Sequence, residues 1–204
     1  MGFYSDQVLP RFVDVTLGKL MDETRERVTA GLAGDVLEIG FGSGRNLPHL
    51  PSPVNRLLAV EPAAGGRKLA SRRIAEAPIP VEFVGTDGQE LPLPDASVNH
   101  VLVTWTLCTI PDVDRALQEI HRVLQPGGTL HFVEHGRSPR PGVAQWQDRL
   151  TPLWGVLFGG CHLNRSIDAL IEGAGLGLDA IRTYNMGGPE LMGYAYEGVA
   201  KKGG

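Results

Sequence analysis

Residues 35–44 read DVLEIGFGSG. The first half of this segment is short and mainly apolar and ends in a glycine, which is typical of a buried parallel strand. Three glycines, at positions 40, 42 and 44, follow where the chain turns toward the next helix. Glycine permits unusual φ angles and lets a ligand approach the backbone closely. The segment therefore predicts a strand, a ligand-binding turn and a helix.

The chain on either side of this segment alternates between strand and helix patterns. Apolar runs predict strands, and segments with one apolar face predict helices. Such alternation implies right-handed crossovers and a mostly parallel sheet with helices on both faces. Two further strands, joined by a glycine-rich segment, predict a closing hairpin. We expect strands at 57–60, 81–84, 98–105, 129–133, 178–184 and 192–200, and helices at 63–75 and 112–124.

No internal repeat or low-complexity linker divides the chain, so we expect one domain over residues 1–204. The fold class is α/β, a Rossmann-like three-layer sandwich. Residues 1–33 read as two helices, the second at 22–32, and are interpreted as a lid. Residues 34–135 form the expected cofactor-binding core. Residues 136–204 supply substrate-side helices and the hairpin.

Composition excludes several classes of protein. The 204 residues are 42% hydrophobic and 21% charged with a net charge of −4, which is globular and argues against a nucleic-acid partner. No apolar run approaches the roughly 20 residues that span a bilayer, and no signal peptide is visible. Contact with a membrane surface is left as an open possibility.

The two cysteines, Cys108 and Cys161, lack metal-ligand spacing. We therefore expect no metal, no disulfide and a cytoplasmic location.

The glycine spacing is similar to a dinucleotide fingerprint, and Glu61 at the end of the second strand could bind the ribose of either type of cofactor. Three details favour a different ligand. Glu38, on the strand itself, suits a cationic amino-acid moiety. Asp87 follows the third strand, where it can accept a hydrogen bond from an adenine amino group. The third glycine also comes one residue earlier than in GxGxxG. A nicotinamide-dependent oxidoreductase, a non-catalytic binding module and a plain tight turn remain alternatives.

Four segments resemble the type 11 family of class I S-adenosylmethionine-dependent methyltransferases: VLEIGFGSG (36–44), LLAVEP (57–62), GTDGQELPLPDASV (85–98) and EIHRVLQPGGTL (119–130). The resemblance implies S-adenosylmethionine as cofactor, with S-adenosylhomocysteine as product, and a seven-stranded sheet whose last strand is antiparallel. It also implies roles for the motif residues. Gly40 and Gly42 would run along the methionine moiety, Glu61 would bind the ribose hydroxyls, and Asp87 the adenine amino group with the Gly88 backbone beside it. The expected cofactor site is completed by Glu38, Pro62 and Thr104.

Ligands of open α/β sheets bind outside the carboxyl ends of the strands. This places residues 104–106 and 134–136 around the transferred methyl. His135 is the expected general base, with a histidine hydrogen-bonded at a strand end as the alternative. We expect Tyr4, Trp105 and His162 on the substrate side. Aromatic and apolar walls are expected from Trp105, Trp146, Leu153, Trp154 and Phe158, with ordinary core as the alternative.

Four further segments narrow the resemblance: WTLCTI (105–110), VEH (133–135), WQDRLTPLW (146–154) and GCHLNR (160–165). They are similar to the methyltransferase-like branch that includes alkyl-thiol methyltransferases. This implies a small, apolar acceptor molecule, with a thiol as first candidate. Phospholipid amines, quinone precursors and other oxygen or nitrogen acceptors stay open as alternatives.

Overall fold

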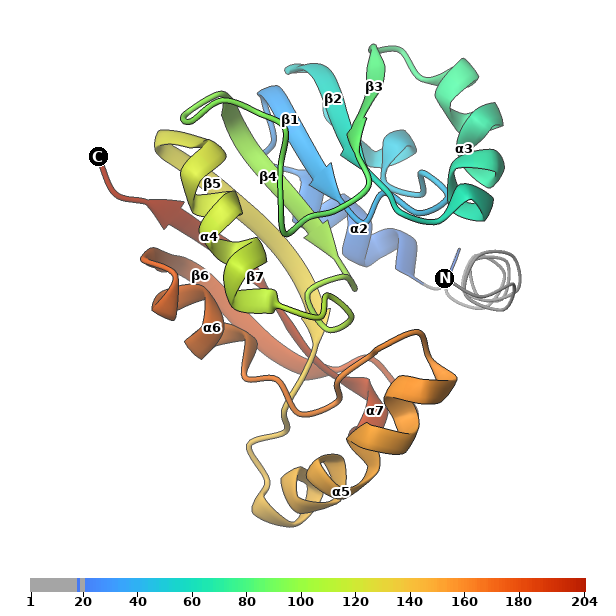
Figure 1. The fold of residues 1–204 in the computed structure, drawn as a ribbon, viewed down its shortest axis with the longest axis vertical. Coiled ribbons are helices and arrows are strands. Elements are labelled where there is room, and N and C mark those ends of the chain that lie inside the picture. The colour runs from blue at the N-terminus through green and yellow to red at the C-terminus, as the bar shows by residue number, and fades with distance from the viewer. Residues whose placement is uncertain (1–17, 19–20) are drawn as a thin grey trace.

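The computed structural model describes Gly18 and residues 21–204. Its centre is a seven-stranded sheet in the order β3-β2-β1-β4-β5-β7-β6 (Figure 1). β7 runs antiparallel to both of its neighbours, and the other paired strands are parallel. The expected mostly parallel sheet with an antiparallel last strand is confirmed. The strands are β1 (Gly34–Ile39), β2 (Val54–Val60), β3 (Val81–Gly85), β4 (Val98–Thr104), β5 (Leu124–His135), β6 (Leu176–Asn185) and β7 (Tyr194–Lys202).

The helices agree with the sequence pattern where it was clearest. The segments predicted at 63–75 and 112–124 form α3 and α4, each within one residue at both ends. Asp112 caps α4 by accepting a hydrogen bond from the backbone N–H of Arg115. The helix predicted at 22–32 ends earlier, and the helix predicted before it lies outside the described residues. The helices are α2 (Asp22–Thr29), η3 (Leu47–His49), α3 (Ala64–Glu76), α4 (Val113–Val123), α5 (Pro141–Leu157), α6 (Ile167–Gly173) and α7 (Glu190–Gly193).

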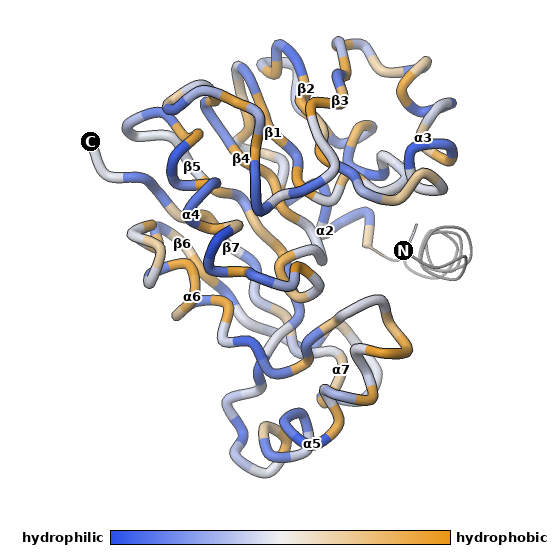
Figure 2. The backbone as a smooth tube through the Cα atoms, in the orientation of Figure 1, coloured by the Kyte–Doolittle hydropathy of each residue, from blue (hydrophilic) through white to orange (hydrophobic). Residues whose placement is uncertain are grey.

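The sheet lies between two layers of helices because its strands are apolar on both faces. Side chains alternate along a strand, so Leu37 and Ile39 of β1 pack in the cluster with α4 and α6. Val36, on the opposite face, packs in the second cluster, which includes residues of α2 and α3. Figure 2 shows the corresponding hydrophobic stretches along the central strands. The predicted three-layer sandwich is confirmed.

Several strand boundaries differ from the sequence prediction: β2 begins at Val54 rather than at 57, β6 begins at Leu176 rather than at 178, and the starts of β5 and β7 differ as well. β5 begins at Leu124 rather than at 129, because Leu124 already pairs with Val98 before the register shifts and Thr129 pairs with His100. The Pro-Gly-Gly segment at 126–128 therefore forms an irregularity inside the ladder. β7 begins at Tyr194 rather than at 192, because the chain first makes the short turn of α7.

Within the part of the chain that the structure describes, no helix combines the length and apolar character needed to cross a membrane.

Candidate active site

The glycine turn after β1 opens onto a cavity of about 840 Å³ at the carboxyl ends of β1, β2, β3 and β4. All the residues that the sequence analysis assigned to the cofactor line it, although they come from four different strand ends. They are Glu38, Gly40, Gly42, Glu61, Pro62, Asp87, Gly88 and Thr104.

The turn itself depends on glycine. Gly40 has φ of +78° and Gly42 has φ of +57°, in the region that side chains disfavour. A Cβ on Gly40 would overlap the side chain of Thr106, whereas a Cβ on Gly42 would meet, among the described residues, only the Gly40 carbonyl oxygen, at 3.9 Å. The backbone at Gly42 is therefore bare toward the cavity, which leaves room for a ligand to lie along it.

Glu61 holds this turn against the end of β2. Its Oε2 accepts a hydrogen bond from the Gly42 N–H at 2.6 Å, and its Oε1 accepts one from the Ala63 N–H at 2.7 Å. Burial raises the pKa of Glu61, and these two backbone donors only partly oppose that shift. A carboxylate has about four acceptor sites, so each oxygen can still accept a bond from a hydroxyl pair in the cavity.

Glu38 is a buried carboxyl with one unsatisfied oxygen. Its Oε1 accepts a hydrogen bond from Asn46 Nδ2 at 2.8 Å, and its Oε2 has no hydrogen-bond partner among the described residues. Burial raises the pKa of Glu38 to about 8. A cationic ligand group placed beside this oxygen would favour the ionised form.

Asn46 and Arg25 are polar residues of the cavity to which the sequence analysis gave no role. Asn46 links Glu38 to Thr104, whose Oγ1 accepts from the same amide nitrogen at 3.1 Å. Arg25 of α2 places its guanidinium 4.9 Å from the ring centroid of Trp105 and also lines the cavity. Neither residue was assigned a role from a motif, and Arg25 reaches the cavity only because α2 packs beside β5.

Asp87 and Gly88 form the cavity wall after β3. Asp87 Oδ1 accepts hydrogen bonds from the side chain and the backbone N–H of Gln89, and these bonds lower the pKa of Asp87. An added Cβ on Gly88 would lie 2.7 Å from Cγ2 of Ile39. Glycine is therefore required there by close packing against β1.

The expected substrate-side residues are only partly brought to the cavity. Trp105 lines it and has φ of +52°, a strained conformation of the kind that collects at functional sites. His135 and His162 are not among its lining residues. His135 Nε2 lies 2.8 Å from Cys161 Sγ, and His162 Nδ1 lies 3.3 Å from the Cys108 carbonyl oxygen. Tyr4 lies outside the described residues.

Glu134 joins the ends of β4 and β5. Its carboxylate is fully buried and accepts hydrogen bonds from the backbone N–H groups of Thr106, Leu107 and Cys108 at 2.6, 2.9 and 3.2 Å. Burial raises the pKa of Glu134 to about 7, against the opposing effect of these donors. The carboxylate thereby fixes the loop that follows Trp105.

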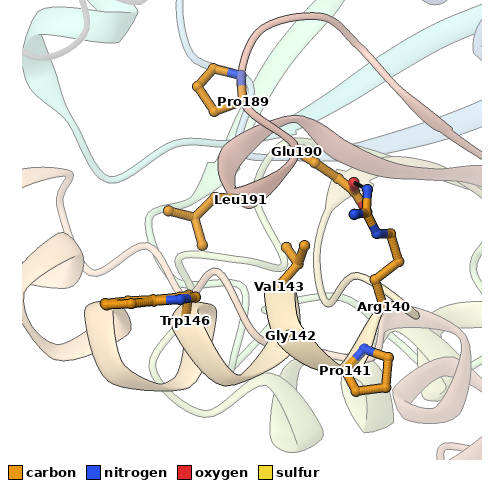
Figure 3. Close-up of a pocket in the computed structure, with 8 residues that line it drawn as sticks. All are labelled: Arg140, Pro141, Gly142, Val143, Trp146, Pro189, Glu190 and Leu191. Atoms are coloured by element: carbon orange, nitrogen blue, oxygen red, sulfur yellow. Dashed lines mark hydrogen bonds and ion pairs between the residues drawn. The ribbon is translucent and has the colours of Figure 1, made fainter.

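Of the five residues expected to wall the acceptor, Trp105 alone lines this cavity within the described chain. Trp146 and Leu153 are 55% and 61% exposed, and Trp154 stacks on Phe158 with ring centroids 4.0 Å apart. Trp146 instead lines a second cavity of about 680 Å³ (Figure 3). That cavity shares no lining residue with the first; its walls come from the start of α5 and from α7, including the Arg140–Glu190 ion pair.

Comparison with known proteins decides the family. Residues 37–132 match the family model described as "Methyltransferase domain". The human thiol S-methyltransferase TMT1A is 33% identical over 178 residues, which cover 81% of this chain and 72% of that protein. The chain belongs to the class I S-adenosylmethionine-dependent methyltransferases. It is thus an enzyme that uses S-adenosylmethionine and gives S-adenosylhomocysteine, and the nicotinamide-dependent and non-catalytic alternatives fall away.

Other relatives support the assignment of this chain to the methyltransferases. Rat thiol S-methyltransferase TMT1B is 36% identical over 143 residues, covering 68% of this chain but only 58% of the rat protein. The solved S-adenosylmethionine-dependent methyltransferase from Mesorhizobium loti superposes with a TM-score of 0.66 at 14% identity, covering 91% of this chain and 99% of that one. That likeness supports the fold.

Two observations indicate that S-adenosylmethionine fits the larger cavity. The buried Oε2 of Glu38, which has no hydrogen-bond partner in the described part of the chain, offers a place for an α-ammonium group. The bare backbone at Gly42 leaves a space that any side chain would fill.

Proposed function

We propose that this methyltransferase transfers the methyl group of S-adenosylmethionine to the sulfur of a small, mostly uncharged thiol. The observation that carries the proposal is the identity to TMT1A, which extends over 178 residues and so well beyond the 37–132 domain match. The segments at 133–135, 146–154 and 160–165, which resemble the thiol-methylating branch, lie outside that match.

In this proposal the cavity residues hold the donor in four ways. Glu38 pairs with the α-ammonium group of the methionine moiety, which lies along the Gly40–Gly42 backbone. Glu61 accepts hydrogen bonds from the ribose hydroxyls, and Asp87 accepts one from the adenine amino group. Hydrogen bonds to an ionised carboxylate are stronger than hydrogen bonds between neutral groups. Pro62, Gly88 and Thr104 complete the walls.

The bound donor supplies a methyl group already activated on a sulfonium, with a neutral leaving group. The chain therefore needs no covalent intermediate, and its task is to hold the acceptor in line with the methyl. Trp105 and Thr106, at the carboxyl end of β4, close the cavity on the acceptor side.

A thiol reacts as its thiolate. His135 remains our proposed residue for ionising the acceptor thiol. Its Nε2 faces Cys161 Sγ, so in this proposal His135 acts together with Cys161 rather than alone. His162, Tyr4 and the lid over residues 1–33 remain predictions.

The test is an acceptor panel. The purified protein is incubated with methyl-labelled donor and, separately, an alkyl thiol, a phenol, an amine, a quinol and phosphatidylethanolamine vesicles. We expect transfer to the thiol, and none with a Gly42→Val variant as the matched background control. Methylation of an oxygen, nitrogen or carbon acceptor without transfer to any alkyl thiol would overturn the thiol assignment and leave the methyltransferase assignment intact.

A further inference from the structure

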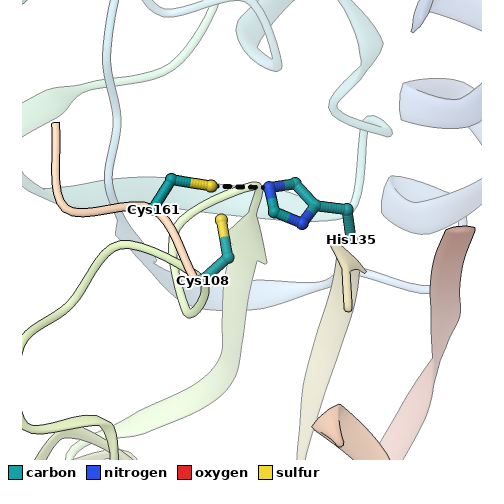
Figure 4. A group of neighbouring side chains, drawn as sticks. All are labelled: Cys108, His135 and Cys161. Carbon is teal, nitrogen blue, oxygen red and sulfur yellow. Dashed lines mark hydrogen bonds between the residues drawn. The ribbon is translucent and has the colours of Figure 1, made fainter. Parts of the chain in front are cut away.

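Three side chains that are distant in sequence converge near the carboxyl ends of β4 and β5. Cys108 follows β4, His135 ends β5, and Cys161 follows α5. Figure 4 shows the two sulfur atoms and the imidazole pointing toward one another. The two Sγ atoms and a ring nitrogen of His135 all lie within 4.8 Å of one another. Both cysteines are free and buried, at 1% and 5% exposure.

We propose that Cys108, Cys161 and His135 bind a zinc ion, and that the fourth coordination position takes the sulfur of the acceptor thiol. Two thiolates and an imidazole are a ligand set that zinc prefers, and three protein ligands with one open position are typical of catalytic zinc. The sequence analysis expected no metal because the two cysteines do not have the short spacing of metal ligands. The order of the strands in the sheet brings the three residues together instead.

The distances suit a tetrahedral ion. Zn–S bonds of about 2.3 Å and Zn–N bonds of about 2.0 Å separate the ligand atoms by roughly 3.5–3.8 Å. The observed separations reach no more than 4.8 Å, and His135 Nε2 lies 2.8 Å from Cys161 Sγ. Shifts of about 1 Å or less would bring all three ligands to a common centre.

The backbone already holds these ligands in place. The Cys108 N–H donates to the buried carboxylate of Glu134, whose chain neighbour is His135. The Cys108 carbonyl oxygen accepts a hydrogen bond from the His162 N–H at 2.7 Å, which ties the two cysteine-bearing loops together. The guanidinium of Arg165 donates to the carbonyl oxygen of Leu107 and brings a positive charge beside the thiols. A site held this way loses little ordering entropy when it binds an ion.

The cluster offers three protein ligands, and in our proposal the acceptor sulfur is the fourth. Among the described residues, no fourth histidine, cysteine or carboxylate joins the cluster. Thr109 and Gly159 line the larger cavity, and each lies within two residues of a ligand cysteine. None of the three ligands lines that cavity, so we place the cluster behind the part of its wall that Thr109 and Gly159 form.

The step at this position rests on the proposed function. An acceptor thiol that binds zinc loses its proton, because a coordinated thiol is deprotonated, and the proton leaves to solvent. The thiolate sulfur forms the new S–CH₃ bond while the sulfonium C–S bond to that methyl breaks. The bonding pair stays on the donor sulfur, which gives a thioether, S-adenosylhomocysteine and one proton.

Metal binding is tested with Co²⁺, which reports thiolate ligands and tetrahedral geometry by visible absorption. We expect one Co²⁺ per chain, displaced by Zn²⁺, and at least 100-fold weaker binding in the double variant Cys108→Ser/Cys161→Ser. His121→Ala, a change to a histidine of α4 outside the cluster, is the control and should bind as the wild type does. A wild-type chain that binds no Co²⁺, or a double variant that binds equally well, overturns the site.

Donor binding by calorimetry checks that the double variant is folded, since the donor residues lie outside the cluster. If that variant does not fold, protection of the wild-type thiols decides instead. Zn²⁺ should shield both cysteines from a thiol-specific reagent, and unprotected thiols, or a Cys108–Cys161 disulfide in freshly purified protein, would overturn the proposal.

The fourth position is tested by adding an alkyl thiol to the Co²⁺ protein without donor. We expect a stronger sulfur-to-cobalt band, and no change with the alcohol of the same size. An unchanged spectrum overturns the coordination step alone. Intact Co²⁺ binding without thiol methylation in the acceptor panel would overturn the proposed function and leave the metal site standing.

Discussion

Asn46 donates a hydrogen bond from its Nδ2 to Oε1 of Glu38 across 2.8 Å, and this bond satisfies only one oxygen of the carboxyl. The other oxygen is buried without a partner among the described residues. Burial raises the pKa of Glu38 to about 8, whereas a glutamate in water ionises near about 4.3. The unliganded site thus holds a neutral carboxyl that can ionise when a cation arrives.

Glu38→Gln should stabilise the unliganded protein in a pH-dependent way. A raised pKa means that the fold disfavours the ionised carboxyl, so the contribution of Glu38 is fully present below about pH 4.3 and is lost as pH rises through 8. The glutamine side chain of the variant cannot ionise, so the variant does not lose this contribution to stability. We expect its melting temperature to match the wild type near pH 4 and to exceed it by on the order of 5 °C at pH 8.5.

The control for this experiment is Glu82→Gln, a change to an exposed glutamate of β3. Its effect on the melting temperature should be small. A Glu38→Gln difference that stays constant between pH 4 and pH 8.5 would contradict the raised pKa.

Donor binding should release a proton from the same carboxyl. At pH 7 most unliganded chains carry a protonated Glu38, because its pKa is about 8. The donor's ammonium group favours the ionised form, so roughly one proton should leave per donor bound. Calorimetry in phosphate and in Tris, which differ in ionisation enthalpy, measures this release. Glu38→Gln should remove the buffer dependence, and a buffer-independent enthalpy in the wild type would count against the assigned ligand.

Glu61→Ala should weaken donor binding by about 1.5–3 kcal/mol, a 10- to 150-fold rise in Kd. The change removes the acceptor for the ribose hydroxyls and also frees the backbone N–H groups of Gly42 and Ala63. Glu61→Gln keeps one acceptor oxygen and should give an intermediate loss. Glu76→Ala, in the exposed last turn of α3, is the control. An unchanged Kd for Glu61→Ala in calorimetry would exclude this residue from the site.

The sequence was most informative where the signal is local. The strand–turn–helix unit at 35–44 combines an apolar run with glycines within ten residues, and the neighbouring strand ends carry Glu61 and Asp87 at predictable places. Parallel strands bring their carboxyl ends to one edge of a sheet, so the order of the residues along the chain is enough to predict that they share a cavity. Their location in the 840 Å³ cavity agrees with this.

The cluster of Cys108, His135 and Cys161 could not be predicted in that way. It depends on β4 lying beside β5 and on the path of the chain after α5, neither of which leaves a local pattern. Asn46 likewise could not be identified from the sequence, because asparagine is common in turns. Its role follows only from the unsatisfied carboxyl of Glu38 beside it.

Glu197→Gln should destabilise the fold by about 1–3 kcal/mol at pH 7. Glu197 accepts hydrogen bonds from Arg27, Arg182 and Tyr184, and so connects α2 to β6 and β7. Burial opposes ionisation, but these bonds outweigh it and lower the pKa of Glu197. Its contribution is therefore present above about pH 4.3 and is lost as pH falls further. Melting temperatures should differ at pH 7 and converge near pH 3, and an equal difference at both pH values would contradict this ion-pair account.

Gly42→Val should abolish donor binding while leaving the protein folded. The glycine has φ of +57°, which costs a branched residue about 1–2 kcal/mol. Within the part of the chain that the structure describes, a Cβ there meets no atom nearer than the Gly40 carbonyl oxygen at 3.9 Å. The fold can therefore accept the side chain, but the side chain occupies the space beside the bare backbone where the donor would lie. Gly188→Val is the matched control, because Gly188 also has positive φ, +73°, with no atom within 4 Å and no place in this cavity. Both variants should lose a similar few degrees of melting temperature, and only Gly42→Val should lose donor affinity by more than 100-fold. A folded Gly42→Val variant that binds the donor with the wild-type Kd would place the donor away from this turn.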